Sequence, residues 1–460
     1  MRYLPHTEEQ VRQMLDAIGA ESVDALFDSV PQAARLERRL HIPLALGEPE
    51  LMQHVSELAQ KNVAAQRLSF VGGGIYHHHI PPVVDQLLLR SEFYTAYTPY
   101  QPEVAQGTLQ SIWEFQTLVS ELLGLPLANA SMYDGASAAA EGAQMARRLT
   151  RRSKVLLSGC LHPETTRVTN TYLSGQPGAV VGDTAACSDG TYDLNEIERA
   201  LDEDVAAVVV GYPGFTGLLK DLRPLVDLAH ERGALVVSNT WQPYALALFE
   251  SPGAMGVDIA TAEGQALATP PNFGGPGLGL FACRNSRKYM QQVPGRLCGE
   301  TLDKDGKRGF VLTLSTREQH IRRERATSNI CTNQGLLALA FTIRLSLLGR
   351  VGFEETARRC LNNAHYLRTQ LSALTGYQVL QSGMSGKEQS AHPFNELTVT
   401  VPGGDASIVV QQLRDSGIEC GLALGRVDPA RKAQLLIATT ELHRKLDLDR
   451  LIAALHGFRT

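Results

Sequence analysis

Short, continuous apolar runs separated by helical stretches constrain the fold of this chain more than any other feature. The runs do not alternate with polar residues, and they lie at Val155–Ser158, Ala179–Gly182, Val205–Val210, Ala234–Ser238, Asp258–Ala260 and Leu278–Phe281. Strands that are buried on both faces have continuous apolar sequences, whereas strands with a solvent-facing side alternate. The pattern therefore predicts an α/β fold with a mainly parallel sheet that is covered by helices on both faces.

The first part of the chain, residues 1–65, reads as an N-terminal helical arm. Thr7 and Gln10 have the spacing of a capping box at the start of a helix that continues to Ile18. Apolar residues recur at helical spacing along this helix, at Val11, Leu15 and Ile18. Because these side chains need a surface to cover, we expect a packed arm and not a free tail.

Two further domains are predicted after the arm. Residues 66–330 contain the apolar runs and form a large α/β domain. Residues 331–460 begin with a long helix over about 334–374 and continue as a smaller C-terminal α/β domain. No low-complexity linker separates these parts, so we expect the domains to pack tightly.

The composition is that of an ordinary globular protein and excludes several functional classes. Hydrophobic residues make up 43% and charged residues 20% of the 460 residues. The net charge of −5 leaves no basic excess to neutralise phosphates, which argues against nucleic-acid binding. No apolar run approaches the roughly 18 residues that span a bilayer, and the start lacks the apolar segment of a secretion signal. The seven scattered cysteines predict reduced thiols in a cytoplasmic protein.

The segment 91–107 has the most unusual chemistry. Tyr94, Tyr97, Tyr100, Gln101 and Glu103 lie close together there with two prolines, a composition that disfavours a regular helix or central strand. A rigid loop that presents phenol hydroxyls suits a site that orients a small polar ligand. Tyrosines that only pack between domains would have the same composition, so both interpretations stay open.

A second polar cluster begins at Thr327, Ser328 and Asn329. Its hydroxyl and amide groups could bind a phosphate or a carboxylate, or could cap the long helix that begins nearby. Capping is the preferred interpretation. Three histidines in a row, residues 77–79, suggest a metal site, but adjacent side chains point in different directions and we predict no metal.

The stretch from Asp221 to Arg287 contains no lysine. A buried strand in this stretch ends in Ser238-Asn239. A second strand begins at Asp258 and is followed by Gln265-Ala266, and a glycine-rich turn follows at 273–279.

This order resembles the core of fold-type-I pyridoxal-phosphate enzymes. In that family the first strand usually ends in an aspartate that holds the pyridine nitrogen, and a lysine after the second strand forms the Schiff base. Here Asn239 stands at the aspartate position, and Gln265 and Ala266 stand at the lysine position. Asp134 precedes the small-residue helix at which this fold holds the cofactor phosphate, and its charge would repel that group. The resemblance therefore implies that this chain has no cofactor-binding residues of its own.

Four segments are similar to the P-protein of the glycine cleavage system. The similarity is narrower to subunit 1 of organisms in which that protein is split in two, and it covers essentially the whole chain. The segments are Glu92–Gly107, Asn129–Ala136, Glu263–Gln265 and Arg325–Gln334.

The family implies a partner and a reaction. A homologous subunit 2 would carry the lysine and the pyridoxal phosphate in an α2β2 assembly. The assembled glycine dehydrogenase (decarboxylating) would release the carboxyl group of glycine as carbon dioxide and pass the aminomethyl group to the lipoyl arm of H-protein. This chain would contribute no covalent catalytic residue and would be inactive alone. The residues expected to reach the partner's substrate pocket are Tyr94, Tyr97, Tyr100, Gln101, Glu103, Thr327, Ser328 and Asn329.

The competing hypothesis is a purely structural subunit that stabilises subunit 2 and the docking of H-protein without touching the substrate. Solvent-accessible tyrosines beside a cleft would favour the pocket hypothesis, whereas tyrosines buried within this chain would favour scaffolding. An independent aminotransferase is disfavoured because Lys220 and Lys288 lie too far from the expected position in the sequence.

Overall fold

A computed structural model describes residues 5–36, 38, 40–380 and 391–458 of the chain. The chain divides into two compact units, Met1–Gln66 and Arg67–Thr460. The predicted subdivision into 1–65, 66–330 and 331–460 stays a prediction.

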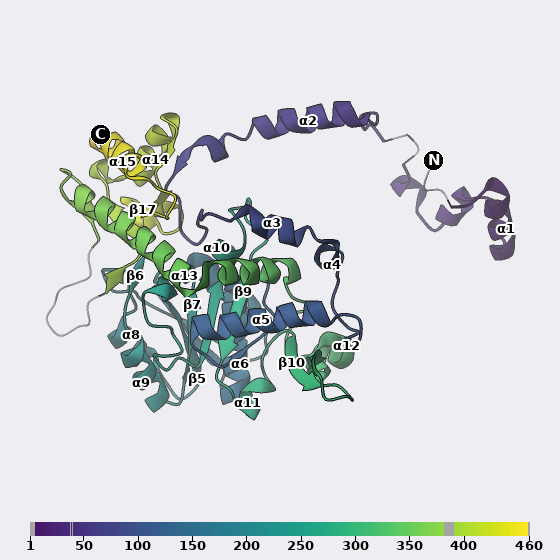
Figure 1. Ribbon diagram of the computed structural model, residues 1–460, viewed down its shortest axis with the longest axis horizontal. Helices are drawn as coiled ribbons and strands as arrows, with labels where there is room; N and C mark the ends of the chain where they lie inside the picture. Colours follow the sequence, from purple (N-terminus) through teal and green to yellow (C-terminus); the bar gives the residue numbers. More distant parts are fainter. Residues whose placement is uncertain (1–4, 37, 39, 381–390, 459–460) are drawn as a thin grey trace. The chain divides into compact units, whose positions relative to one another are not determined.

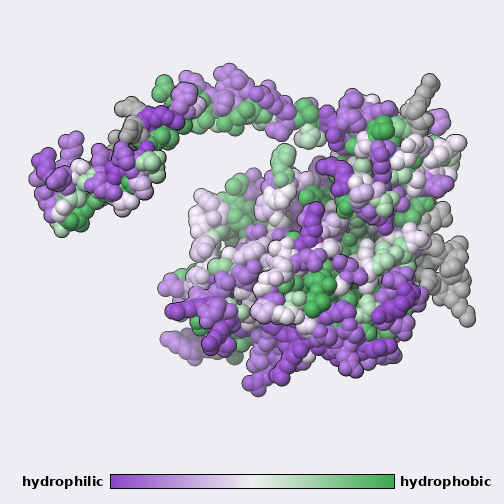
Figure 2. Space-filling model, turned by 180° about the vertical axis from the view of Figure 1, so that it is seen from behind, coloured by the Kyte–Doolittle hydropathy of each residue, from purple (hydrophilic) through white to green (hydrophobic). Residues whose placement is uncertain are grey.

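The first unit contains α-helices and short 3-10 turns. Helix α1 (Glu8–Ile18) begins with the predicted capping box, because Thr7 Oγ1 accepts a hydrogen bond from the Gln10 amide and the Gln10 side chain accepts one from the Thr7 amide. Helix α2 (Glu48–Gln60) follows after two short 3-10 turns, Asp24–Phe27 and Gln32–Ala34. Figure 2 shows apolar side chains along one side of α2 and hydrophilic ones along the other. Wherever burial is described in this unit, every residue is exposed or half-buried.

The second unit is built around a seven-stranded sheet in the order β2-β9-β8-β7-β5-β3-β4 (Figure 1). Neighbouring strands are parallel except at β9, which is antiparallel to both β8 and β2. The predicted apolar runs overlap six of these strands, which confirms the mainly parallel sheet. The strands are β2 (Leu127–Ala128), β3 (Lys154–Ser158), β4 (Val180–Thr184), β5 (Val205–Gly211), β7 (Leu235–Thr240), β8 (Ile259–Glu263) and β9 (Gly279–Cys283).

Helices cover both faces of this sheet. Alternate residues of each strand enter different cores, so that Val236 packs on one face and Val237 on the other. The first face is covered by α5 (Gln106–Leu123), α8 (Leu194–Ala200), α9 (Arg223–Glu231) and the first half of α13 (Gly335–Ser372). The second face is covered by α6 (Gly135–Thr150) and α7 (Pro163–Ser174). The loops that follow β3, β7 and β8 therefore meet at one edge of the sheet, where α/β folds place their ligands.

A separate apolar core belongs to the C-terminal part of the chain. Its four-stranded antiparallel sheet has the order β12-β14-β17-β16, with bounds Gln378–Val379, Glu396–Thr400, Gln434–Ala438 and Leu422–Ala423. Helices α14 (Ala406–Asp415) and α15 (Lys445–His456) pack on this sheet. Strand β1 (Leu68–Ser69) pairs with β15 (Ile418–Glu419), and Phe70 is buried in this core although it precedes the large sheet in sequence.

Short elements complete the second unit. They are α3 (Pro82–Leu88), α4 (Ser91–Tyr94), α10 (Gln265–Ala268), α11 (Arg287–Met290), α12 (Gln319–Arg322), the hairpin β10 (Leu297–Leu302) with β11 (Arg308–Thr313), and the pair β6 (Leu218–Leu219) with β13 (His392–Pro393).

Helix α13 corrects one expectation about apolar segments. Among the described residues it is the one helix that is long and apolar enough to cross a membrane, with a mean hydropathy of 1.6 in its most apolar window. The sequence count missed it because Arg344 interrupts the apolar run. Arg344 is buried, and its Nη2 donates a hydrogen bond of 2.8 Å to the hydroxyl of Tyr244. The first half of α13 thus packs as a core helix on α5 and the sheet, as Figure 1 shows.

Candidate functional site

A cavity of about 530 Å³ lies at the edge of the large sheet where the loops after β3, β7 and β8 meet. These loops place His162, Trp241 and Gln265 on its wall, and the start of α6 adds Asp134. The glycine-rich turn at 274–277 closes another side. None of the described lining residues is a lysine.

Asn239 occupies the end of β7 and is fully buried. Its Oδ1 accepts a hydrogen bond of 2.7 Å from the Thr165 hydroxyl. Its Nδ2 donates to the carbonyl oxygen of Gly135 and to Thr261 Oγ1, each at 3.0 Å. An aspartate here would set a carboxylate oxygen against the Gly135 carbonyl, so this environment is matched to an amide.

Gln265 begins α10 directly after β8, and its side chain is only 6% exposed. Its Nε2 donates to the carbonyl oxygen of Thr269, while its Oε1 has no hydrogen-bond partner among the described residues. Ala266 beside it is buried in the apolar core. Neither residue can form a Schiff base.

Two carboxylates occupy the N-terminus of α6. Asp134 Oδ1 accepts a hydrogen bond of 2.7 Å from the amide of Ser137, and Glu263 Oε2 accepts one of 2.8 Å from the amide of Gly135. Burial raises the pKa of Glu263 to about 7, with the charge of Asp134 adding to the rise and three backbone amides opposing it. A bound anion would need these same amides and would meet a carboxylate on each side.

The pocket therefore does not fit pyridoxal phosphate. At the positions that the resemblance assigns to the ring-nitrogen carboxylate and the Schiff-base lysine it has Asn239 and Gln265, and two carboxylates already accept the amides at the start of α6.

The segment 91–107, the tyrosine loop, lies in another part of the second unit. The expectation of no regular helix in segment 91–107 was wrong at its two ends, because the single turn α4 ends at Tyr94 and α5 begins at Gln106. Tyr94, Tyr97 and Tyr100 are 55%, 78% and 58% exposed, and Gln101 and Glu103 are also exposed. Part of this loop and the segment before α13 line a cavity of about 170 Å³.

The structure brings the tyrosine loop and the second polar cluster together. Thr98 Oγ1 lies 3.2 Å from Thr332 Oγ1. Buried Arg296 donates through Nη2 to the Tyr100 hydroxyl at 3.1 Å and to the carbonyl oxygen of Cys331 at 2.9 Å, and its guanidinium lies over the Tyr100 ring. Sequence reasoning missed Arg296, because an isolated arginine after a glycine has no local motif.

The preferred capping role of the polar cluster was wrong. The N-cap of α13 is Gln334, which makes no capping hydrogen bond with its side chain. Thr327 and Ser328 are half-buried and Asn329 is exposed. Burial raises the pKa of Glu141 on α6, while the nearby Arg148, Ser328 and the Asn329 backbone lower it. The large domain holds the end of the cluster, because the amides of Cys331 and Gln334 donate hydrogen bonds to the hydroxyls of Tyr133 and Ser131.

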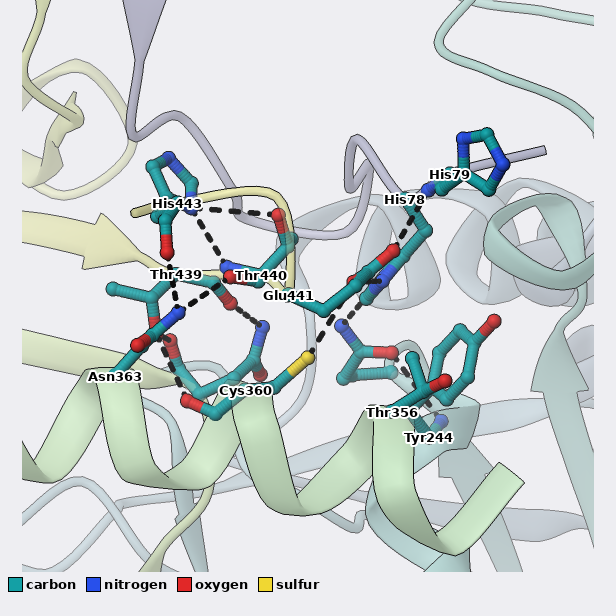
Figure 3. Close-up of polar contacts among 12 residues, drawn as sticks. His78, His79, Tyr244, Thr356, Cys360, Asn363, Thr439, Thr440, Glu441 and His443 are labelled. Carbon is teal, nitrogen blue, oxygen red and sulfur yellow. Dashed lines mark hydrogen bonds and ion pairs between the residues drawn. The ribbon is translucent and has the colours of Figure 1, made fainter. Parts of the chain in front are cut away.

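The histidine run alternates between solvent and interior: His77 and His79 are exposed and His78 is buried. Figure 3 shows His78 beside Glu441 and Cys360 from distant segments, with candidate ligand atoms within 4.8 Å of one another. His78 Nδ1 lies only 2.6 Å from Glu441 Oε2. A tetrahedral ion bound to both atoms would hold them roughly 3.3 Å apart. The spacing fits a direct hydrogen bond, and the prediction of no metal stays a prediction.

Comparison with known proteins identifies the family. The model of the glycine cleavage system P-protein family matches residues 1–455. The chain belongs to this family. It is 56% identical over the full length of both chains to a probable glycine dehydrogenase (decarboxylating) subunit 1 of Sorangium cellulosum. This member of the P-protein family is therefore a subunit 1 and a component of an enzyme.

Solved structures agree with this assignment. A crystal structure of glycine decarboxylase (P-protein) in inhibitor-bound form has a TM-score of 0.85 at 41% identity, covering 99% of each chain. A sphingosine-1-phosphate lyase of Burkholderia pseudomallei has a TM-score of 0.63 at 16% identity over 93% of each chain, which shows the shared fold. The P-protein subunit thus has the fold-type-I architecture expected from its sequence.

Proposed function

We propose that this P-protein subunit acts without a cofactor of its own, in the cytoplasm, in an α2β2 assembly with a homologous subunit 2. Subunit 2 carries the pyridoxal phosphate. Together the subunits decarboxylate glycine and transfer the aminomethyl group to the lipoyl arm of H-protein. The proposal rests on one contrast. The pocket at the edge of the large sheet does not fit the cofactor, whereas the tyrosine loop is exposed and open to a partner.

The tyrosine loop and the neighbouring polar cluster, which begins at Thr327, carry hydroxyl and amide groups that suit the wall of a partner's substrate pocket. Within the part of the chain that the structure describes, nothing hydrogen-bonds the hydroxyl of Tyr97, which is 78% exposed. Tyr100 is held in place by Arg296, so its ring and hydroxyl have a fixed direction. A partner that covers this surface would meet donors already in position, which lowers the entropy cost of orienting a substrate.

Pyridoxal phosphate supplies an electron sink for the pair left when carbon dioxide departs. This chain's role is to orient and to exclude water. Tyrosine rings on the loop would remove water around the glycine carboxylate, and phenol hydroxyls would donate hydrogen bonds to it. Removal of water favours loss of a charged carboxylate as a neutral gas. Thr327, Ser328 and Asn329 are proposed as further contacts on the same surface.

Reconstitution with Tyr97→Phe separates this role from scaffolding. The ring is retained, so assembly with subunit 2 is expected to be unchanged. Loss of one hydrogen bond to a charged group would lower the exchange of labelled carbon dioxide with glycine about 10- to 150-fold. The exchange rate and the sedimentation of the complex with lipoylated H-protein present are the measurements.

Tyr366→Phe is the matched control, since that tyrosine lies in the C-terminal core and bonds Asp449. Exchange at the wild-type rate from Tyr97→Phe, Tyr100→Phe and the double variant would support the purely structural subunit. Full activity of subunit 2 alone would exclude both forms of the proposal.

A further inference from the structure

The indole of Trp241 lies flat on the imidazole of His162. Their ring centroids are 3.8 Å apart, and the planes differ by 21°. His162 is fixed on both sides, because its Nε2 hydrogen-bonds the Gly73 carbonyl at 2.7 Å and its Nδ1 accepts from the Glu164 amide at 3.1 Å. Burial lowers the pKa of His162 to about 4, so the imidazole is neutral. The stack is a fixed pair of rings at the wall of the cavity.

The indole nitrogen is connected to Asn239, the residue that the resemblance places at the ring-nitrogen position. Trp241 Nε1 donates to Thr165 Oγ1 at 3.0 Å, and the Thr165 hydroxyl donates to Asn239 Oδ1 at 2.7 Å. The aromatic N–H of Trp241 thus reaches Asn239 through one hydroxyl.

Side chains of this subunit also occupy the start of α6, where the resemblance places the phosphate of the cofactor. The amides of Gly135 and Ser137 at the start of α6 donate to the carboxylates of Glu263 and Asp134. Glu263 accepts two further backbone hydrogen bonds, from Gln265 at 2.9 Å and from Leu278 at 2.8 Å. A negative charge at a helix N-terminus is stabilised whether it comes from a ligand or from a side chain.

We infer that Trp241, with Asp134 and Glu263, substitutes for the cofactor in this subunit. The indole takes the position of an aromatic ring, and the two carboxylates take the position of a phosphate. The site is therefore assembled and stable with no ligand bound. This inference depends on the geometry of the pocket and does not require the proposed pairing with subunit 2.

Binding of free indole to a variant without the Trp241 ring tests whether the indole of Trp241 takes the position of an aromatic ring. Trp241→Ala removes the ring from the stack and is expected to lower Tm by about 5–10 °C. An apolar cavity on the order of 150 Å³ can bind a small aromatic molecule. Free indole is therefore expected to bind the variant saturably at one site and to restore most of the lost Tm, by scanning fluorimetry and calorimetric titration.

Trp113→Ala is the matched control, because Trp113 is the other tryptophan and contacts Phe310 in a different core. Indole is expected to leave its Tm unchanged. Trp241→Phe keeps a ring and is expected to retain most of the stability, which separates stacking from a failure to fold. An unchanged Tm in Trp241→Ala, or an equal effect of indole on both alanine variants, would overturn the inference.

The carboxylates are tested with two ring ligands that differ by a phosphate. Trp241→Ala is expected to bind pyridoxal on the order of tenfold more tightly than pyridoxal 5′-phosphate. A second substitution, Asp134→Asn, keeps a good helix N-cap and removes one negative charge. The double variant should therefore show a smaller difference in affinity between pyridoxal and pyridoxal 5′-phosphate. Preferential binding of pyridoxal 5′-phosphate by Trp241→Ala, or stoichiometric binding by the wild-type chain, would show that the carboxylates do not occupy the anion position.

Discussion

At the residue scale, the side chain of Glu441 joins two segments that are far apart in the sequence. Its Oε2 hydrogen-bonds His78 Nδ1 at 2.6 Å, and its Oε1 accepts from the His79 amide at 2.7 Å (Figure 3). Burial alone would raise the pKa of Glu441, but its hydrogen bond to His78, the electrostatic interaction with that ring and two backbone hydrogen bonds outweigh burial and lower this pKa to about 2. The carboxylate is therefore ionised in the folded chain at neutral pH.

Glu441→Gln is expected to destabilise the chain by about 1.5–3 kcal/mol at pH 7, because the amide nitrogen faces a donor. Since the folded pKa lies below the unfolded value, the wild-type advantage is present above the unfolded pKa of about 4.5 and is lost as pH falls toward 2. Urea unfolding at several pH values measures the difference between the variants.

The control for this prediction is Glu354→Gln, which removes an exposed pair with Arg350 and should cost below about 1 kcal/mol. If Glu441→Gln lowers the free energy of unfolding by the same amount from pH 7 to pH 2, the conclusion that Glu441 is ionised in the folded chain is contradicted.

At the scale of elements, two helix starts illustrate how packing overrides local preference. Gly135 is the first residue of α6, and a Cβ there would lie 2.9 Å from the backbone nitrogen of Glu263. Gly107 lies in the first turn of α5, where a Cβ would meet nothing within 4 Å. The close approach of α6 to the end of β8 is what brings Glu263 to the helix amides.

Gly135→Ala is expected to lower the free energy of unfolding by about 1–3 kcal/mol, because backbone atoms must shift. Gly107→Ala is the matched substitution and is expected to raise it by about 0.5–1 kcal/mol through helix propensity. Denaturant unfolding of both variants measures the contrast, and equal effects would show that the α6–β8 contact tolerates a methyl group.

At the scale of the whole molecule, the two units differ in what stabilises them. The unit Arg67–Thr460 has large apolar cores on both faces of its main sheet and a further one in its C-terminal part. The unit Met1–Gln66 has no residue described as buried. Short helices without tertiary packing are marginal in water.

A peptide of residues 1–66 is therefore expected to show weak helicity and no cooperative thermal transition. A chain of residues 67–460 is expected to melt cooperatively. Circular dichroism and calorimetry of the two pieces and the full chain check this, and a cooperative heat-absorption peak from the peptide alone would refute it.

Local patterns were sufficient for much of the fold. The capping box of α1 and the apolar strands depend on residues close together in sequence. The positions of Asn239 and Gln265 also followed from sequence, since each ends or follows a predicted strand. The short β1–β15 pairing could not be predicted, because two-residue strands have no periodicity.

The sequence alone determined the fold class, the family and the absence of a lysine at the expected position, because these depend on residue identity and order. Only the tertiary structure decided that Trp241 stacks on His162 and that Arg296 joins Tyr100 to Cys331. Tertiary structure likewise decided that Glu263 bonds the start of α6. These contacts join segments tens to hundreds of residues apart, and their distances depend on how helices pack across a sheet, which local periodicity does not specify.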